Sequence, residues 1–317
     1  MKKIIITFVC SVVLASLFVI CKYTWFEKAM ANANYGMRAV YNADNISDLF
    51  IGSSMFRQGI NAGELGESNF QLSYNGNQPV YEAMELRRLI DKGAKIKRVV
   101  IDMYAYSAIS DIGVSDTRLL MDGDIAFTFS IYRKLRESGD GYGIGSLYRM
   151  VVQENNEMFL TWPVSFPLIN ARSCRGSITA ENTGATAAEL ESLENKEFET
   201  ADLSVDQIGG IEGIIGLCRE NGIELLFLET PKYAKVYETP MYADIMRKYV
   251  SLLGGYDVNV IMSQRTYDEV GGGLTGSDKI RTYEYDYERP EYFIDLLHIS
   301  SDGRKQFSSV LAPMLAI

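Results

Sequence analysis

Short apolar runs alternate with longer helical segments along this 317-residue chain, and this alternation constrains the fold more than any other feature. The runs are rich in Val, Ile, Leu and Phe and lack the apolar–polar alternation of a half-exposed strand, so they predict strands buried on both faces. Such strands are expected at 45–54, 70–74, 98–103, 223–228 and 258–262. Helical spacing predicts helices at 79–92, 205–220 and 241–253, a mostly helical stretch at 117–170, and a last helix capped by Ser301. The chain is therefore expected to be an α/β protein with a central parallel sheet between layers of helices.

Polar residues follow several of the expected strands. Ser54, the turn at Asn75, the stretch after Met103 and Thr230 all lie at such positions. In open parallel sheets, ligands bind at the carboxyl ends of the strands. We therefore expect the functional site at this edge of the sheet.

The chain has one histidine, His298, in the segment Asp295-Leu296-Leu297-His298. An aspartate three residues before a histidine can orient the imidazole and stabilise its positive charge, and the imidazole can accept a proton from a serine hydroxyl. Taken alone, a single histidine is more often a structural residue, and Gly52-Ser53-Ser54 is a common type of turn. Because serine, aspartate and histidine occur together in this order at expected strand ends, serine-type acyl chemistry is the favoured interpretation.

These motifs resemble those of SGNH/GDSL-type hydrolases, specifically the membrane-anchored DltD-like branch. Gly52-Ser53-Ser54 is similar to the first block of that family, in which Gly-x-Ser carries the nucleophile, and this similarity assigns the nucleophile to Ser54 rather than Ser53. Asp295 and His298 are similar to the last block, and 300–303 resembles the stretch that follows it. The resemblance covers about residues 46–317. It implies a flavodoxin-like three-layer sandwich in which His298 is the general base and Asp295 orients it.

The segment Asn75-Gly76-Asn77-Gln78 resembles the second block of the family, whose glycine amide helps form the oxyanion hole. The resemblance implies that role for Gly76, with the Met55 amide and Asn75 as further donors.

The third block of the family usually supplies an oxyanion Asn, but residues 102–107 of this chain contain none. Either Asn75 or Asn77 substitutes, or the amides of Met55 and Gly76 suffice, or the activity is weakened. Loss of one donor typically costs ~10²- to 10³-fold in rate. Asp102 is interpreted as a strand-end residue held by a backbone amide rather than as a pocket acid.

The N-terminus carries Lys2-Lys3 and then an uncharged run from Ile4 to Cys21. As a helix with a rise of ~1.5 Å per residue, that run spans roughly 27 Å, enough for a bilayer core. A cleaved signal peptide is the alternative, since 29–31 reads Ala-Met-Ala. We favour an uncleaved transmembrane anchor at 1–28, a single pass through the cell membrane with a cytoplasmic N-terminus. Residues 29–317 then form an extracytoplasmic domain, with an exposed insertion near 177–204, which is poor in large apolar residues.

The composition excludes several classes of function. A net charge of −10 without a basic cluster argues against nucleic-acid binding, because phosphate contacts need Lys and Arg. Without a His cluster or a CxxC motif, no metal and no cofactor are expected. The glycines of 141–145 do not follow a strand, so they do not indicate a dinucleotide site. Cys174 and Cys218 either pair or remain buried thiols.

The resemblance implies a serine esterase or acyltransferase that acts on acetyl or D-alanyl groups of a cell-surface glycan or teichoic acid. A membrane-bound O-acyltransferase is an expected partner. The alternative is a catalytically weak or inactive accessory protein that binds a glycan or such a partner through the same cleft. The tyrosines at 283, 285, 287 and 292 form either a carbohydrate-stacking wall or ordinary packing.

Overall fold

The computed structural model describes residues 2–21, 40, 43–113, 125–139, 141–148, 150, 177, 181–195, 198–270 and 279–316. A parallel sheet lies at the centre, with the strand order β2-β1-β3-β4-β5-β6. Every neighbouring pair of strands is parallel. The strands are β1 (Asn45–Gly52), β2 (Phe70–Ser73), β3 (Lys95–Asp102), β4 (Glu224–Leu228), β5 (Asn259–Ser263) and β6 (Ile280–Tyr283). The expected α/β class with a central parallel sheet is confirmed, and the order of the first five strands is the flavodoxin-like one.

The strands are buried where their sequences are continuously apolar. β1 and β3 each begin with an exposed residue and end in five successive buried positions. Leu49, Phe50 and Ile51 of β1, like Val99, Val100 and Ile101 of β3, are completely buried. The sheet sits between two helical layers, which explains why neither face shows a polar alternation.

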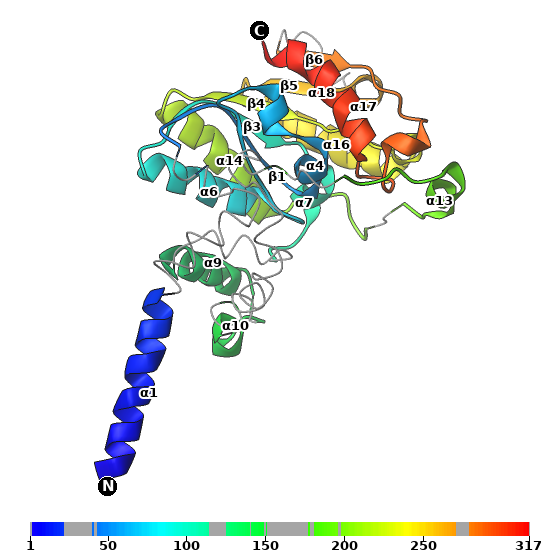
Figure 1. The fold of residues 1–317 in the computed structure, drawn as a ribbon. Helices are drawn as coiled ribbons and strands as arrows, with labels where there is room; N and C mark the ends of the chain where they lie inside the picture. Colours follow the sequence, from blue (N-terminus) through cyan, green and yellow to red (C-terminus); the bar gives the residue numbers. More distant parts are fainter. Residues whose placement is uncertain are drawn as a thin grey trace.

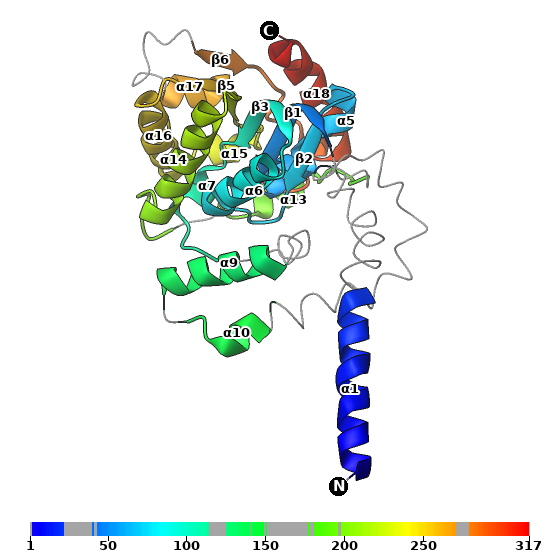
Figure 2. The ribbon, with the colours of Figure 1, turned by 90° about the vertical axis from the view of Figure 1, so that its left-hand side faces the viewer.

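One layer contains α6 (Pro79–Asp91), α14 (Val205–Glu220) and α16 (Pro240–Gly254), and the other contains α4 (Ser54–Gly59), α5 (Ala62–Leu65) and α18 (Ser301–Leu315). Figure 2 shows the strands between these two layers. The remaining elements are α1 (Lys2–Cys21), α7 (Ala105–Ile109), α9 (Ile125–Ser138), α10 (Ile144–Tyr148), α13 (Ala187–Ser192), α15 (Ala234–Tyr237), α17 (Gln264–Val270) and the 3₁₀ helix η5 (Pro290–Tyr292).

The helices expected at 79–92, 205–220 and 241–253 are confirmed to within a residue or two. The cap of the last helix is wrong by one position. Ser300, with an extended backbone, is the N-cap of α18, and its hydroxyl accepts the amide of Gly303 at 3.2 Å. The Ser301 hydroxyl instead accepts the amide of Asn182 at 2.8 Å. Of the stretch 117–170, the structure describes mainly α9 and α10, and the rest of that prediction lies outside the described residues.

The stretch 177–204 contains both exposed and buried positions among its described residues. Ser177 and Leu190 are completely buried. A Cβ on Gly184 would lie 2.0 Å from the carbonyl oxygen of Glu291, so this segment packs closely against the loop that leads to His298. Thr186 and Glu189 form a reciprocal capping box that begins α13.

The tyrosines at 283, 285 and 287 are buried and contact one another or Phe307 and Phe293. This is ordinary packing, so the interpretation of these three as a carbohydrate-stacking wall is wrong. Cys218 is buried in α14 and unpaired. Cys174 lies outside the described residues.

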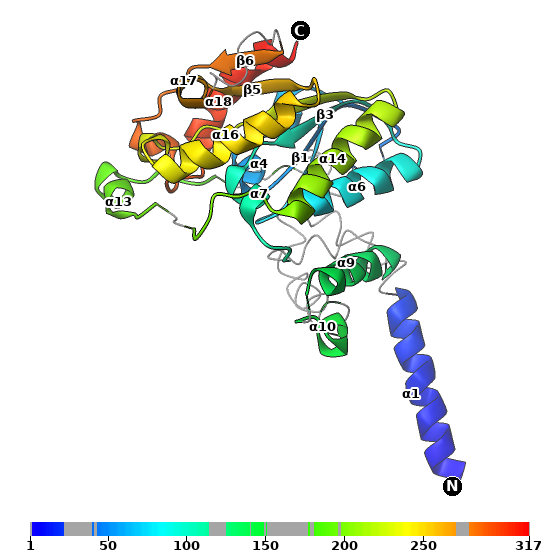
Figure 3. The same ribbon diagram turned by 180° about the vertical axis from the view of Figure 1, so that it is seen from behind.

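Helix α1 stands apart from the sheet and its covering helices (Figures 1 and 3). Ile4 and Phe8 are among its large apolar side chains that are exposed. In the described part of the chain, no helix has both the length and the hydropathy that a membrane span requires. The expected transmembrane anchor is therefore not confirmed.

Candidate active site

Ser54 is placed by the junction between β1 and α4. Gly52 ends the strand, Ser53 is the N-cap with an extended backbone, and Ser54 is the first residue of the helix. The junction needs a glycine because a Cβ on Gly52 would lie 2.4 Å from the Cβ of Asp102, the last residue of the neighbouring β3. This close approach sets Ser54 at the carboxyl edge of the sheet.

His298 is oriented by a tight turn built on Asp295. The Asp295 carboxylate accepts the amides of Leu297 and His298, both at 2.8 Å. The same carboxylate lies 2.8 Å from His298 Nδ1 through Oδ2 and 3.0 Å through Oδ1. The other ring nitrogen, Nε2, lies 2.8 Å from the Ser54 Oγ. The three side chains therefore form a continuous hydrogen-bonded line from Ser54 to Asp295.

The loop that carries His298 is held on both sides. The amide of Ile294 donates to the carbonyl of His298 at 2.8 Å, which closes the turn. The amide of Tyr233, in the segment after β4, donates to the carbonyl of Leu296 at 3.0 Å. Phe293 and Ile299 form an isolated antiparallel bridge at the base of the loop. The imidazole is thus fixed at the sheet edge while its side chain remains 23% exposed.

The charge state of Asp295 suits a partner of an imidazolium. Burial acts to raise its pKa, but the hydrogen bond and charge of His298 and the amides of Leu297 and His298 outweigh burial. The net result is a pKa below the ordinary value of 3.8. Asp295 is therefore ionised at neutral pH, and it can stabilise a positive charge on the ring.

The expected oxyanion donors lie in the turns that follow β1 and β2. Asn75 and Gly76 are exposed in the turn after β2, where Gly76 has a φ of 62°. The Tyr74 amide donates to the carbonyl of Gly52 at 3.1 Å, which fixes this turn against the end of β1. The Met55 amide donates to the Ser53 Oγ at 3.2 Å.

Asn77 has a different environment from Asn75. Its side chain is buried, and Nδ2 donates to the Oε2 of Glu85 at 3.2 Å. The side-chain amide of Asn77 therefore donates to a buried carboxylate. This argues against Asn77 as the substitute for the family's third-block Asn.

The end of β3 carries a contact that the sequence did not indicate. Asp102 Oδ2 accepts the Ser53 amide at 3.2 Å, as expected for a strand-end residue held by a backbone amide, and it also accepts the Ser53 hydroxyl at 2.5 Å. Burial raises the pKa of Asp102 to about 6, against the lowering effects of the Ser53 hydroxyl, Lys232 and the backbone amides. The signal available in the sequence is an aspartate that ends the strand next to the Gly-Ser-Ser turn.

Tyr104 follows Asp102 by two residues. Its pKa is raised above the usual value, first by burial and then by the nearby charges of Asp102, Tyr106 and Asp295. The phenol therefore stays protonated and can act only as a neutral hydrogen-bonding group at the edge that carries the site.

A second buried polar group that the sequence did not indicate lies after β4. Glu229 and Lys232 are almost completely buried and form an ion pair at 3.4 Å.

Within the described ranges, no group of three or more His, Cys, Asp or Glu side chains is placed so that it could hold a metal ion.

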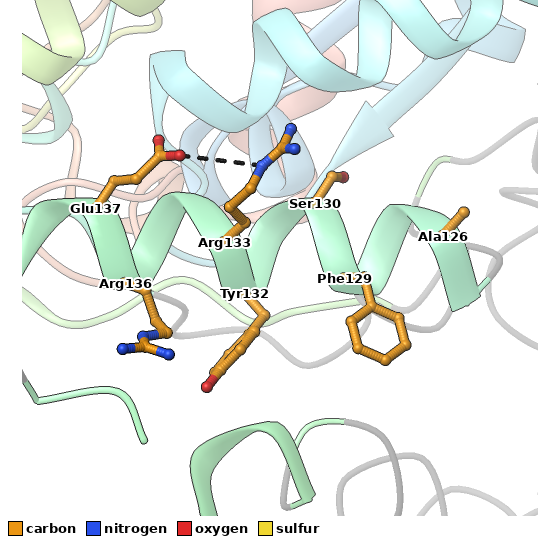
Figure 4. Close-up of a pocket in the computed structure, with 7 residues that line it drawn as sticks. All are labelled: Ala126, Phe129, Ser130, Tyr132, Arg133, Arg136 and Glu137. Carbon is orange, nitrogen blue, oxygen red and sulfur yellow. Dashed lines mark ion pairs between the residues drawn. The ribbon is translucent and has the colours of Figure 1, made fainter. Parts of the chain in front are cut away.

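A cavity of about 690 Å³ lies along α9. Figure 4 shows its lining side chains, which include Phe129 and the ion pair of Arg133 with Glu137 at 3.9 Å. Ser54, Asp295 and His298 are not among the residues that line it.

No protein-family model matches the chain, and no curated protein sequence matches it. Among solved structures, the chain is similar to a protein from Bacteroides fragilis NCTC 9343 named a "putative acylhydrolase". The two are 10% identical with a TM-score of 0.35, over 86% of each chain. It is also similar to a protein from Streptococcus pneumonia named a "putative platelet activating factor". That pair is 12% identical with a TM-score of 0.36, over 95% of this chain and 99% of the other. At these values, the similarity carries no argument about the chemistry of this chain.

Proposed function

We propose that this protein is a serine esterase or acyltransferase that forms an acyl-enzyme on Ser54. The observation that carries the proposal is the unbroken line from Ser54 Oγ to His298 Nε2 at 2.8 Å and from His298 Nδ1 to Asp295 Oδ2 at 2.8 Å. This is the arrangement in which a base takes the serine proton while a carboxylate holds the base in one tautomer.

The reaction follows from the position of each group. His298 Nε2 accepts the proton of Ser54 as its Oγ attacks the carbonyl carbon of an ester, and a tetrahedral intermediate forms. His298 returns that proton to the departing alcohol oxygen as the C–O bond breaks, which leaves the acyl group on Ser54. Water or an acceptor hydroxyl then gives its proton to His298 and attacks the carbonyl carbon of the acyl-enzyme. His298 returns this proton to the Ser54 Oγ as the bond between Oγ and that carbon breaks, and Ser54 is regenerated.

The negative oxygen of the tetrahedral intermediate needs hydrogen-bond donors. The amides of Met55 and Gly76 are assigned this role, with the Asn75 side chain as a third donor. Support for Gly76 and Asn75 comes from the turn after β2, which the Tyr74 amide fixes against the end of β1. The Met55 amide donates to the Ser53 Oγ, so its assignment rests on the resemblance. Each such donor is worth ~10²- to 10³-fold in rate.

The acyl groups are assigned as acetyl or D-alanyl groups of a cell-surface polysaccharide or teichoic acid, and a membrane-bound O-acyltransferase as a partner. This assignment rests on the sequence motifs around Ser54 and His298. A membrane location with an extracytoplasmic catalytic domain rests on Lys2-Lys3 and the uncharged run that follows. No nucleic acid is expected as a partner of a chain with a net charge of −10.

The proposal is tested by labelling the purified full-length protein with a fluorophosphonate probe, which reacts with an activated serine. We expect labelling of the wild type and none of Ser54→Ala or His298→Ala. Ser130→Ala is the matched control, because the Ser130 hydroxyl donates to the carbonyl of Phe127 on α9. Labelling that persists in Ser54→Ala would overturn the assignment of the nucleophile.

A second candidate function is a non-catalytic accessory protein that binds a glycan or a membrane partner through the same edge of the sheet. One observation favours it: the loop after β3 offers Tyr104 and no Asn, so a side-chain oxyanion donor of the usual kind is missing there. This candidate predicts a well-folded wild type that the probe does not label.

A further inference from the structure

The carboxylate of Asp102 holds Ser53 at two points. Its Oδ2 accepts the Ser53 amide at 3.2 Å and the Ser53 hydroxyl at 2.5 Å. Both residues are buried, Ser53 at 0% and Asp102 at 3% exposure, so water does not compete for these bonds. A short hydrogen bond to an ionised acceptor is about twice as strong as one between neutral groups.

Ser53 in turn organises the first turn of α4. Its hydroxyl, the one bound to Asp102, also accepts the Met55 amide at 3.2 Å. Its carbonyl accepts the Arg57 amide at 3.0 Å, the first hydrogen bond of the helix. Ser54 lies between Ser53 and Met55, so its backbone is fixed from both sides by groups that lead back to Asp102.

We propose that Asp102 is a positioning residue for the nucleophile: through Ser53 it fixes the Ser54 Oγ against His298 Nε2. The inference rests on the proposed function, because it assigns a role in the acyl transfer at Ser54. Asp102 touches neither substrate nor the reacting atoms. It acts through the hydroxyl and amide of Ser53.

Charged and titratable groups surround Asp102 on the elements that pack against it. Glu82 faces it from α6, Tyr249 from α16, Lys232 from the segment after β4, and Tyr104 from its own strand end. Asp102 Oδ1 has no hydrogen-bond partner within the described part of the chain.

Glu82 is buried, and its pKa is raised well above the ordinary value by burial and by the charges of Asp102 and Glu85. Burial therefore favours the protonated form of Glu82. Glu82 lies on α6, whereas the bonds of Asp102 to Ser53 join the end of β3 to the start of α4, so Glu82 is a suitable control position.

Protonation of Asp102 would change its bond to Ser53. The ionised carboxylate accepts both Ser53 donors through one oxygen. A protonated carboxyl has an O–H donor of its own, which also needs an acceptor among these buried groups. An asparagine at this position keeps an acceptor oxygen for Ser53 and does not titrate. An alanine removes the acceptor altogether.

The test measures the second-order rate constant for fluorophosphonate labelling of the full-length protein between pH 5 and pH 9, approximate limits chosen to bracket the Asp102 pKa. We expect Asp102→Ala and Ser53→Ala to label more slowly than the wild type by about tenfold to hundredfold, because a small displacement of the nucleophile has effects of this size. Asp102→Asn should label close to the wild-type rate near pH 8. Its loss of labelling at low pH should follow one ionisation fewer than that of the wild type.

Glu82→Gln is the matched control and should keep the wild-type rate near pH 8, because glutamine is nearly isosteric with glutamate and position 82 lies on α6, outside the bonds between Asp102 and Ser53. Circular dichroism shows which variants are folded. If Asp102→Ala does not fold, the rate of Ser53→Ala and the pH profile of Asp102→Asn decide the question.

The outcomes separate the two proposals. If the folded wild type is not labelled, the proposed function fails and the role of Asp102 falls with it. If the wild type is labelled and Ser54→Ala is not, but Ser53→Ala and the pH profile of Asp102→Asn match the wild type, only the positioning role is overturned.

Discussion

The Ser54 Oγ lies 2.8 Å from His298 Nε2, although 244 positions separate the two residues along the chain. Ser54 comes from the end of the first strand, and His298 from the loop in front of the last helix. Helix α18, which follows that loop, packs against α4, which begins at Ser54. The contact between the two side chains therefore depends on the complete sheet and on one layer of helices.

The Asp295→Asn variant should lose most of its reactivity and little of its structure. An asparagine side chain has a single acceptor oxygen. That oxygen can accept the amides of Leu297 and His298, but no second acceptor oxygen is then available to His298 Nδ1. The ring then has no carboxylate to hold its tautomer or to stabilise its positive charge. We expect the labelling rate constant to fall by about 10²- to 10⁴-fold.

The measurement for Asp295→Asn is the fluorophosphonate rate constant together with the midpoint of urea unfolding. Asp302→Asn is the control, since Asp302 lies on the first turn of α18 and pairs with the exposed Lys305. A rate within a few-fold of the wild type would show that Asp295 only shapes the loop.

The Asp102→Asn variant should be more stable than the wild type at pH 7. Burial raises the pKa of Asp102 from 3.8 to about 6 in the folded protein. Between these values the folded state binds more protons than the unfolded state, so stability falls as pH rises from about 4 to 6 and stays lower above. A shift of about two pH units corresponds to roughly 3 kcal/mol, which asparagine should recover at pH 7.

Urea unfolding at pH 4 and pH 7 checks this expectation. The stabilisation by Asp102→Asn should be present at pH 7 and largely absent at pH 4, where the wild-type carboxyl is protonated. Asp111→Asn, at an exposed position, should show no such difference. An equal effect of Asp102→Asn at both pH values would show that the charge of Asp102 has no cost.

Two adjacent glycines of α14 should respond in opposite ways to alanine. Gly209 is exposed, and a Cβ there meets nothing within 4 Å. Gly210 is buried against α6, and a Cβ there would lie 2.4 Å from the backbone of Pro79 and Val80. Gly209→Ala should raise the free energy of unfolding by about 0.5–1 kcal/mol, since glycine is a poor helix former.

Gly210→Ala should lower the free energy of unfolding by about 1–3 kcal/mol, because α14 and α6 must move apart to accept the methyl group. Urea unfolding of both variants gives the comparison. A stabilising effect of Gly210→Ala would mean that the two helices separate at little cost.

The sequence predicted the strands that are buried on both faces and missed the one that is not. β1, β3, β4 and β5 are recognisable because burial demands a continuous apolar run. β6 lies at the edge of the sheet, and its Ile-Arg-Thr-Tyr sequence is buried only at Tyr283. An edge strand with three half-exposed positions carries no such run, so the pattern gives no sign of it.

The candidate site also contains one contact that a local motif predicts and one that it does not. Asp295 and His298 lie three positions apart, so their contact follows from a local turn that a short motif can indicate. The bond between Ser53 and Asp102 depends instead on the register of β1 against β3, in which Ile51 lies opposite Ile101. Nothing local in the sequence specifies that register.

The buried ion pair of Lys232 with Glu229 should make Lys232 a sensitive position for stability. Lys232 Nζ lies 3.4 Å from Glu229 Oε1 and donates to the carbonyl of Thr230 at 2.9 Å. The carboxylate also accepts donors from Tyr242 at 2.6 Å, Thr266 at 2.8 Å and the Ser263 amide at 3.0 Å, so it ties β4, β5 and two helices together. Those bonds hold the charge of Glu229 in place, and Lys232 neutralises it.

The Lys232→Met variant keeps the length of the side chain and removes the only cation within 4 Å of Glu229 in the described part of the chain. A buried carboxylate left without its cation typically costs about 3–5 kcal/mol, so we expect a loss of that size in urea unfolding at pH 7. Adding Glu229→Gln should recover most of the loss, because the amide oxygen can still accept from Tyr242 and Thr266 without carrying a charge. If the double variant is no more stable than Lys232→Met, the packing of the lysine stem matters more than the charge, and the ion pair does not stabilise this end of the sheet.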